Sequence, residues 1–265
     1  MKKVLFWILA IVITLAAAVY QRMTGPTYPI MGASEINGAS VSYYLPRSHE
    51  IGEDCTIRLK AENPEITGVI SFRRHKTGED WTQIPMTRAE SALMANLPEQ
   101  PPAGKLDYNI ILSYQDNQLR IPEDELIVIR FKGKVPGYVL WPHVIIIFLA
   151  MLFSTRTGIE ALDPKGNTQT LAIWTLALLF VGGMILGPLV QKFAFDAFWT
   201  GFPFGTDLTD NKTLIAFVAW IAAVIAGRKG RNARAWVLAA SIILLLIYLI
   251  PHSLFGSELD YSQTG

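Results

Sequence analysis

The sequence has one cysteine, Cys55, and few charged residues, which make up 17% of its 265 positions. A single cysteine cannot form a disulfide within the chain or build a cysteine-rich metal site. The pattern around it favours a buried strand residue over a reactive thiol. The formal net charge is only +1, so the chain has no basic field to attract nucleic acid.

The sequence also lacks the common catalytic motifs. It contains no Walker loop, no GxSxG, no HExxH and no recognisable pair of catalytic carboxylates. Its apolar runs are expected to hold no buried Asp, Glu, Lys or Arg, which argues against an ion-coupled transporter. These absences favour a protein that is not an enzyme.

Long apolar runs are present at both ends of the chain. Lys2 and Lys3 precede an uncharged run from Val4 to Tyr20. Residues 1–24 are therefore expected to be a transmembrane anchor, or a signal peptide cleaved near residues 16–18. Both interpretations place the following residues on the far side of the membrane.

Residues 25–135 have the pattern of a β-sandwich. Period-two alternation between turn residues predicts about seven strands, which is typical of immunoglobulin-like sandwiches. The predicted strands are 39–45, 54–60, 67–74, 81–86, 91–97, 105–114 and 124–131. The stretch from Leu97 to Tyr108 resembles the tyrosine-corner region of fibronectin type III domains.

Residues 136–265 are expected to form a transmembrane region of four spans. Its apolar runs are 138–153, 170–190, 213–227 and 234–250. The predicted fold class is thus a membrane α-helical bundle plus an all-β domain, in the order anchor, sandwich, four spans. Counting the N-terminal run as the first span, the third span is 170–190. In it Gly183 and Gly187 form a GxxxG, which lets another helix approach closely.

The basic residues of the short loops predict the orientation. Arg156, Lys165 and the arginine-rich loop 228–234 should be cytoplasmic together with Lys2 and Lys3. The sandwich, the loop 191–212 and the tail 251–265 should then share the extracytoplasmic side of a bacterial cytoplasmic membrane.

The loop 191–212 is rich in aromatic residues. Phe195, Phe198 and Phe202 would share one face of a short helix, which would float at the lipid headgroups or, alternatively, line a substrate pocket. Asp207 and Asp210 precede the fourth span. Asp210 is expected to be its N-cap, with a cation site as the alternative, and Lys212 is expected to pair with Asp207 or to extend outward.

Two histidines lie at predicted span ends on this same side. His143 follows Trp141 and Pro142, and His252 follows Pro251. Together with nearby acids they could bind a transition metal, ligate haem or exchange protons with a quinol, or they could only bond to neighbouring helices. The residues that would form the metal site are His143, His252, Asp207, Asp210 and Glu258. His49 and His75 are expected to be solvated.

Three stretches carry a wider resemblance: WPHVIIIFLAMLFSTRTGIEAL, FWTGFPFGTDLTDNKTLIAF and IPHSLFGSELDY. They resemble segments of uncharacterised bacterial multi-pass membrane proteins, which implies a location and no activity. The sequence therefore predicts a non-enzymatic accessory or assembly subunit of a larger membrane complex, with lipid and other membrane subunits as partners. The alternative is a metal-, haem- or quinol-binding redox component with its site at the outer face. The small-molecule ligand, if one exists, stays unidentified.

Overall fold

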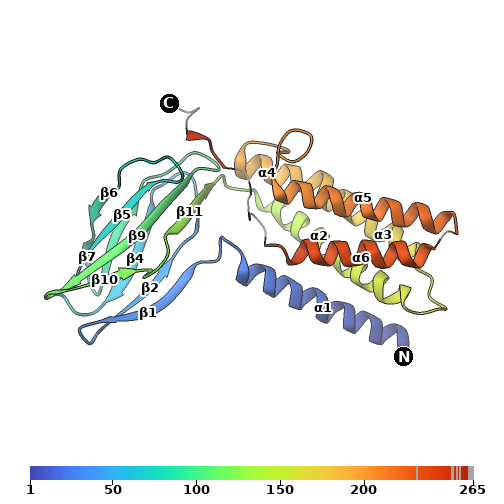
Figure 1. Cartoon of the computed structure of the whole chain (residues 1–265), viewed down its shortest axis with the longest axis horizontal. Helices are drawn as coiled ribbons and strands as arrows, with labels where there is room; N and C mark the ends of the chain where they lie inside the picture. Colours follow the sequence, from blue (N-terminus) through green and yellow to red (C-terminus); the bar gives the residue numbers. More distant parts are fainter. Residues whose placement is uncertain (231, 252–253, 255, 257, 262–265) are drawn as a thin grey trace. The chain divides into compact units, whose positions relative to one another are not determined.

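The computed structural model describes residues 1–230, 232–251, 254, 256 and 258–261. The chain divides into two compact units (Figure 1). The helical unit comprises Met1–Pro26 and Val135–Ser257, and the β unit comprises Thr27–Lys134 and Glu258–Gly265. The chain therefore passes between the units three times, and its tail belongs to the β unit.

The described residues of the β unit form eleven strands in two sheets. One sheet has the order β1-β2-β4-β8-β7, and the other has the order β3-β11-β9-β5-β6 with β10 also paired to β9. The strands are β1 (Ile30–Ile36), β2 (Ala39–Leu45), β3 (Ser48–Glu50), β4 (Cys55–Ala61), β5 (Thr67–Arg74), β6 (Thr82–Pro85), β7 (Thr87–Ala89), β8 (Ala92–Leu97), β9 (Lys105–Tyr114), β10 (Asn117–Ile121) and β11 (Ile127–Lys132).

Local sequence explains these strands. In β4 every second residue is buried, from Cys55 to Ala61, which is the pattern of a strand with one face on a core. Asn37 and Gly38 join β1 to β2 with φ of 47° and 74°, the positive values that a two-residue hairpin turn requires. The core draws large aliphatic side chains from both sheets, such as Leu59, Ile70 and Ile110.

Two predicted features of the β unit can be checked directly. Cys55 is buried in the core, as predicted, and this burial raises the pKa of its thiol to about 11. The resemblance to a tyrosine corner is not confirmed. The Tyr108 hydroxyl donates to the carbonyl of Pro46, 2.9 Å away, whereas a tyrosine corner bonds to backbone a few residues upstream.

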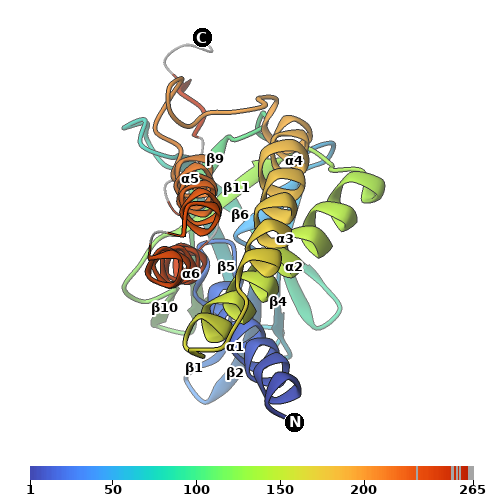
Figure 2. The ribbon, with the colours of Figure 1, turned by 90° about the vertical axis from the view of Figure 1, so that its right-hand side faces the viewer.

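The helical unit contains α1 (Lys2–Thr24), α2 (Gly137–Ala161), α3 (Gln169–Leu179), α4 (Gly187–Phe195), α5 (Leu208–Arg228) and α6 (Ala233–Leu249). A π-helical segment, η1 (Phe180–Leu186), joins α3 to α4 without a break. Figure 2 looks along α5 and α6, which lie side by side. Within the described residues, four helices are long and apolar enough to cross a membrane: Lys2–Thr24, Gly137–Ala161, Gln169–Phe195 and Leu208–Arg228. These properties are compatible with a multi-pass membrane protein.

Contacts between the helix ends show how the helices run. Lys2 forms an ion pair of 2.6 Å with Asp163, just after α2, and Arg234 at the start of α6 donates to the carbonyl of Pro164. At the other end, the Gln21 side chain donates to the carbonyl of Tyr248 over 2.7 Å. The start of α1, the end of α2 and the start of α6 therefore lie together. We call this the basic end, because Lys2, Lys3, Lys165, Arg228, Lys229 and Arg234 lie at or beside these helix termini.

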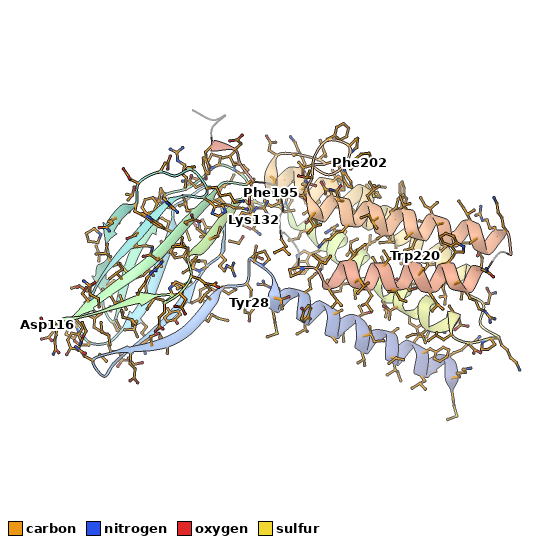
Figure 3. The ribbon with its side chains drawn as sticks, in the orientation of Figure 1. Tyr28, Asp116, Lys132, Phe195, Phe202 and Trp220 are labelled. Atoms are coloured by element: carbon orange, nitrogen blue, oxygen red, sulfur yellow. The ribbon has the colours of Figure 1, made fainter. Side chains whose placement is uncertain are left out.

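The interior of the helical unit is built mainly from small residues around one large one. Ala150, Ala172, Ala216 and Ala223 are buried, and Trp220 is fully buried among them (Figure 3). Small residues let helix backbones approach closely where apolar burial gives no drive to associate. The interior is therefore typical of helices packed in lipid.

One buried ion pair departs from the sequence-based prediction. Arg156 and Glu160 of α2 are buried and paired, with Nη2 to Oε2 at 2.6 Å. The Arg156 guanidinium also lies over the rings of Phe6 and Trp7 of α1. The prediction that the spans hold no buried charge is wrong here, because α2 continues beyond the end of its apolar run.

The predicted fold class is wrong in the form in which it was made. The N-terminal helix is not a separate anchor, because α1 packs with the later helices in one unit. The middle of the chain is a β-rich region of two sheets with eleven described strands, where seven were predicted. The region after it does not contain four helices of spanning length, since α6 has only 17 residues.

Candidate functional site

The chain between α4 and α5 forms an irregular loop, residues 196–207. Asp196 ends α4 with a φ of 60°, a left-handed conformation that stops a helix. The predicted short helix, with Phe195, Phe198 and Phe202 on one face, is therefore wrong, because the helix ends at Phe195. The loop instead turns back through backbone hydrogen bonds from Phe204 and Gly205 to the carbonyl of Gly201, both 2.9 Å.

Asp207 is the N-cap of α5. Its Oδ1 accepts hydrogen bonds from the amides of Thr209 at 2.7 Å and Asp210 at 3.2 Å, which satisfies two donors left over by the helix start. The prediction that Asp210 is the N-cap is therefore wrong by one turn.

Asp210 holds the loop against α5. Its Oδ2 accepts from the backbone amides of Thr200 at 2.6 Å and Gly201 at 3.0 Å, and from the Thr200 hydroxyl at 3.3 Å. The next residue, Asn211, accepts from the amide of Phe202 at 2.6 Å. Asp210 is buried. Charge-assisted bonds of this kind in a buried place fix the loop backbone.

Lys212 is buried and binds the end of α6. Its Nζ donates to the carbonyls of Ile250 at 2.9 Å and Pro251 at 3.4 Å. These carbonyls lie at the C-terminal end of a helix, where a cation is favourable. The side chain is buried and does not extend outward, which was one of the two predicted alternatives.

His143 bonds to the π-helical segment. Its Nδ1 lies 2.9 Å from the carbonyl oxygen of Gly182, which also accepts from the amide of Gly187 at the end of η1. Gly183 faces α5 closely, since a Cβ there would lie 2.8 Å from Cγ2 of Thr213. The predicted close approach at the GxxxG is thus confirmed for Gly183.

The predicted metal ligands that the structure describes belong to two different units. His143, Asp207 and Asp210 belong to the helical unit, and Glu258 belongs to the β unit. His252 lies outside the described residues. Among the residues that are described, no group of three or more His, Cys, Asp or Glu side chains could hold a metal ion. A metal site that includes His252 stays a prediction.

The tip of the 196–207 loop is aromatic and exposed. Phe202 and Phe204 are 69% and 82% exposed, and Phe198 is also exposed. Figure 3 shows Phe202 on this loop, away from the buried Trp220. The loop therefore combines a base fixed by Asp210 and Asn211 with a tip of uncovered rings. We call residues 202–204 the aromatic tip.

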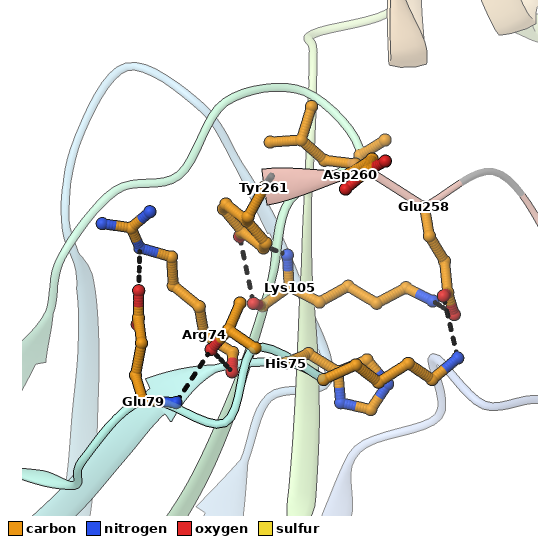
Figure 4. Close-up of a pocket in the computed structure, with 11 residues that line it drawn as sticks. Arg74, His75, Glu79, Lys105, Glu258, Asp260 and Tyr261 are labelled. Atoms are coloured by element: carbon orange, nitrogen blue, oxygen red, sulfur yellow. Dashed lines mark hydrogen bonds and ion pairs between the residues drawn. The ribbon is translucent and has the colours of Figure 1, made fainter. Parts of the chain in front are cut away.

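The β unit carries a polar pocket of about 510 Å³ that the C-terminal tail helps to form (Figure 4). Glu258 of the tail lies between Lys76 at 2.8 Å and Lys105 at 2.5 Å. Partial burial alone would raise the pKa of Glu258, but the hydrogen bonds and charges of both lysines outweigh it and lower the pKa to about 2. The sequence indicated neither this pocket nor its tail contact.

A histidine of the pocket wall bonds to a buried aspartate behind it. His75 Nδ1 lies 2.5 Å from Oδ1 of Asp107, and Arg73 approaches the other oxygen of Asp107 at 3.7 Å. Asp107 is buried in β9. The prediction that His75 is solvated is wrong, because the carboxylate fixes its ring. His49 is partly buried beside Phe131.

Neither comparison with known proteins gives a relative: no protein-family model matches the chain, and no curated protein matches its sequence.

Proposed function

We propose that the protein is an accessory or assembly subunit of a larger membrane complex, and that it acts by docking rather than by catalysis. The aromatic tip carries this proposal. Its rings are exposed, yet its base is held by Asp210 and Asn211 through hydrogen bonds of 2.6–3.0 Å. A large apolar group on a fixed loop is typical of an interaction site. Little conformational entropy is lost when a partner covers a loop that is already ordered.

The proposed location is the bacterial cytoplasmic membrane, with the basic end of the helical unit in the cytoplasm. Lysines and arginines of short loops are enriched on the cytoplasmic side of membranes. The aromatic tip would then lie on the extracytoplasmic side, because the continuous helix Gln169–Phe195 and α5 both have their far ends at the basic end. The β unit would lie on that side too, since the chain enters it after α1 and leaves it before α2.

One set of variants tests both the docking and the side. A photo-cross-linking residue at Phe204 should form adducts with another protein in intact membranes. The same residue at Trp174, an exposed aromatic of α3, should form lipid adducts alone. A Phe202→Ser, Phe204→Ser double variant should lose co-migration with that partner after mild detergent extraction and keep the thermal stability of the isolated chain.

A Phe204→Cys variant reports the side of the membrane. A membrane-impermeant thiol reagent should label it from outside, while Lys229→Cys should need permeabilised membranes. The native Cys55 is buried and gives little background. Lipid adducts alone at residue 204, together with a clean monomer in native gels, would show that the aromatic tip only anchors the loop at the bilayer surface. Labelling of Lys229→Cys from outside would overturn the orientation.

A further inference from the structure

The tail contributes two side chains to the pocket on the β unit. Glu258 binds Lys76 and Lys105, and three residues later Tyr261 binds the start of β9 (Figure 4). The Tyr261 hydroxyl accepts from the amide of Lys105 at 2.9 Å and lies 3.0 Å from Oε1 of Gln100. The Arg74 guanidinium lies over the Tyr261 ring, 5.2 Å from its centre. The pocket therefore contacts the charge of Glu258, and the hydroxyl and the ring of Tyr261.

The backbone at Gly104 passes close to the tyrosine hydroxyl. A Cβ on Gly104 would lie 2.8 Å from Cβ of Gln100 and from the carbonyl oxygen of Pro101, and 2.9 Å from the Tyr261 hydroxyl, so the glycine suits both its own loop and the hydroxyl. Between the two anchors, the amide of Leu259 donates to the carbonyl of Ala103 at 3.2 Å. The tail thus lies extended over the 103–105 segment, with a glutamate at one end and a tyrosine at the other.

The pocket requires an anion at the glutamate position. Among the described lining residues outside the tail, Arg74, Lys76 and Lys105 are cationic and only Glu79 is acidic. The Lys105 side chain is 13% exposed, and its burial lowers the pKa of the ammonium group despite the charge of Glu258. Burying a charge without a partner is unfavourable. The pocket therefore favours any segment that brings a carboxylate to this point.

Part of the tail's contact with the pocket lies at exposed positions that a competing segment can reach. The Lys76–Glu258 pair lies at the rim, with side chains 66% and 37% exposed, and exposed pairs contribute roughly 0–1 kcal/mol, whereas Lys105 is the more buried partner of Glu258. Within the described residues, the backbone amide of Leu259 donates to the carbonyl of Ala103, and the tail is not assigned to a strand of the sheet. Hence the same contacts could be made by another chain that presents the same groups.

We propose that this pocket is a binding site for an extended acidic segment of a partner protein, with a glutamate followed three residues later by a tyrosine. The chain's own Glu258–Tyr261 occupies the site until the partner displaces it. This site lies on the β unit and does not depend on the docking of the aromatic tip, so either proposal can fail alone.

The test uses the purified chain in detergent and a labelled peptide with the sequence of residues 257–261, Ser-Glu-Leu-Asp-Tyr. A chain shortened after Ser257 should bind the peptide, as measured by fluorescence anisotropy. The full chain should bind it at least about tenfold more weakly, because a tethered competitor has an effective concentration of about 1 mM.

Variants of the peptide and of the chain identify the contacts. Replacing the peptide glutamate by glutamine should weaken binding about tenfold, since charge-assisted bonds are the stronger ones. Lys76→Glu and Lys105→Glu should weaken it at least as much. Lys60→Glu makes the same change of charge at an exposed lysine of β4 outside this pocket and should bind as the parent does.

The pH dependence gives a second readout that needs no variant. The pKa of Glu258 falls from 4.5 to about 2 in the pocket, so the carboxylate favours the bound state above pH 4.5. That contribution is lost as the pH falls from 4.5 to 2, and peptide affinity should fall with it. The proposal is overturned if the shortened chain stays folded and binds no peptide, or if the glutamine peptide binds equally well. Dimers of the full chain formed by exchanged tails would assign the site to a second copy and also overturn it.

Discussion

The two units fill their interiors with different side chains. In the β unit large aliphatic residues such as Leu59 and Ile110 are fully buried, and most charged residues lie outside the core. In the helical unit the interior holds alanines, Trp220 and the Arg156–Glu160 pair. Many of its large aliphatic residues face outward, including Val4, Leu5, Ile145 and Ile225. Water drives the first arrangement through apolar burial. The second suits lipid, in which only close packing and polar bonds favour an inside position.

The largest expected effect tests the buried charges of the helical unit. Glu160→Ala should destabilise the protein by about 3–5 kcal/mol, because it leaves the Arg156 guanidinium buried without a counter-charge. Unfolding followed by titration with sodium dodecyl sulfate in mixed micelles measures this change. An Arg156→Met, Glu160→Leu double variant removes both charges and should be within about 1 kcal/mol of the parent. A single variant as stable as the double would mean that Arg156 reaches solvent or another anion.

A second pair of variants compares the two interiors directly. Leu59→Ala, in the core of the β unit, should destabilise that unit by about 2–5 kcal/mol through lost burial and a cavity. Ile225→Ala removes a side chain of similar size from the outward face of α5 and should change stability by less than about 0.5 kcal/mol. Circular dichroism during heating in detergent follows both variants. Equal losses would mean that Ile225 is covered by protein in the intact assembly.

The alternation of apolar and polar residues predicted several strands of the β unit correctly. The expected strands 39–45, 67–74 and 105–114 coincide with β2, β5 and β9, because each alternates between turn residues. It missed β1, whose residues 30–36 show no clear alternation before the Asn37-Gly38 turn. The sequence also places the end of the second span too early, because the charge of Arg156 is typical of a loop. In the sequence, Arg156 and Glu160 look like part of a polar loop. Their burial depends on α1, whose Phe6 and Trp7 cover Arg156.

The candidate sites were harder to predict because they join residues far apart in the chain. Asp210 was identified as a helix-start residue, yet its bonds to Thr200 and Gly201 depend on how the loop folds back. His75 directly follows β5 and Asp107 lies in the neighbouring strand β9, and only the pairing of these strands brings the two residues together. Glu258 was proposed as a metal ligand from its side of the membrane, while its contacts are Lys76 and Lys105, more than 150 positions away. Periodicity carries no information about such pairs.

The smallest expected effect concerns how closely the small residues of the helical unit pack. A Cβ on Gly158 of α2 would lie 2.8 Å from Cβ of Ser241 in α6, so Gly158→Ala should force the helices apart and cost about 1–3 kcal/mol. Gly137 begins the same helix, and there a Cβ meets nothing nearer than Cδ1 of Trp141 at 3.6 Å. Gly137→Ala is therefore the matched control and should change stability by less than about 0.5 kcal/mol. Thermal unfolding of both variants in the same detergent separates contact between helices from helix propensity, because alanine is the better helix former at both positions. If Gly158→Ala were as stable as Gly137→Ala, α2 and α6 would have room to spare, and the contrast between a close-packed helical interior and an aliphatic β core would lose its basis.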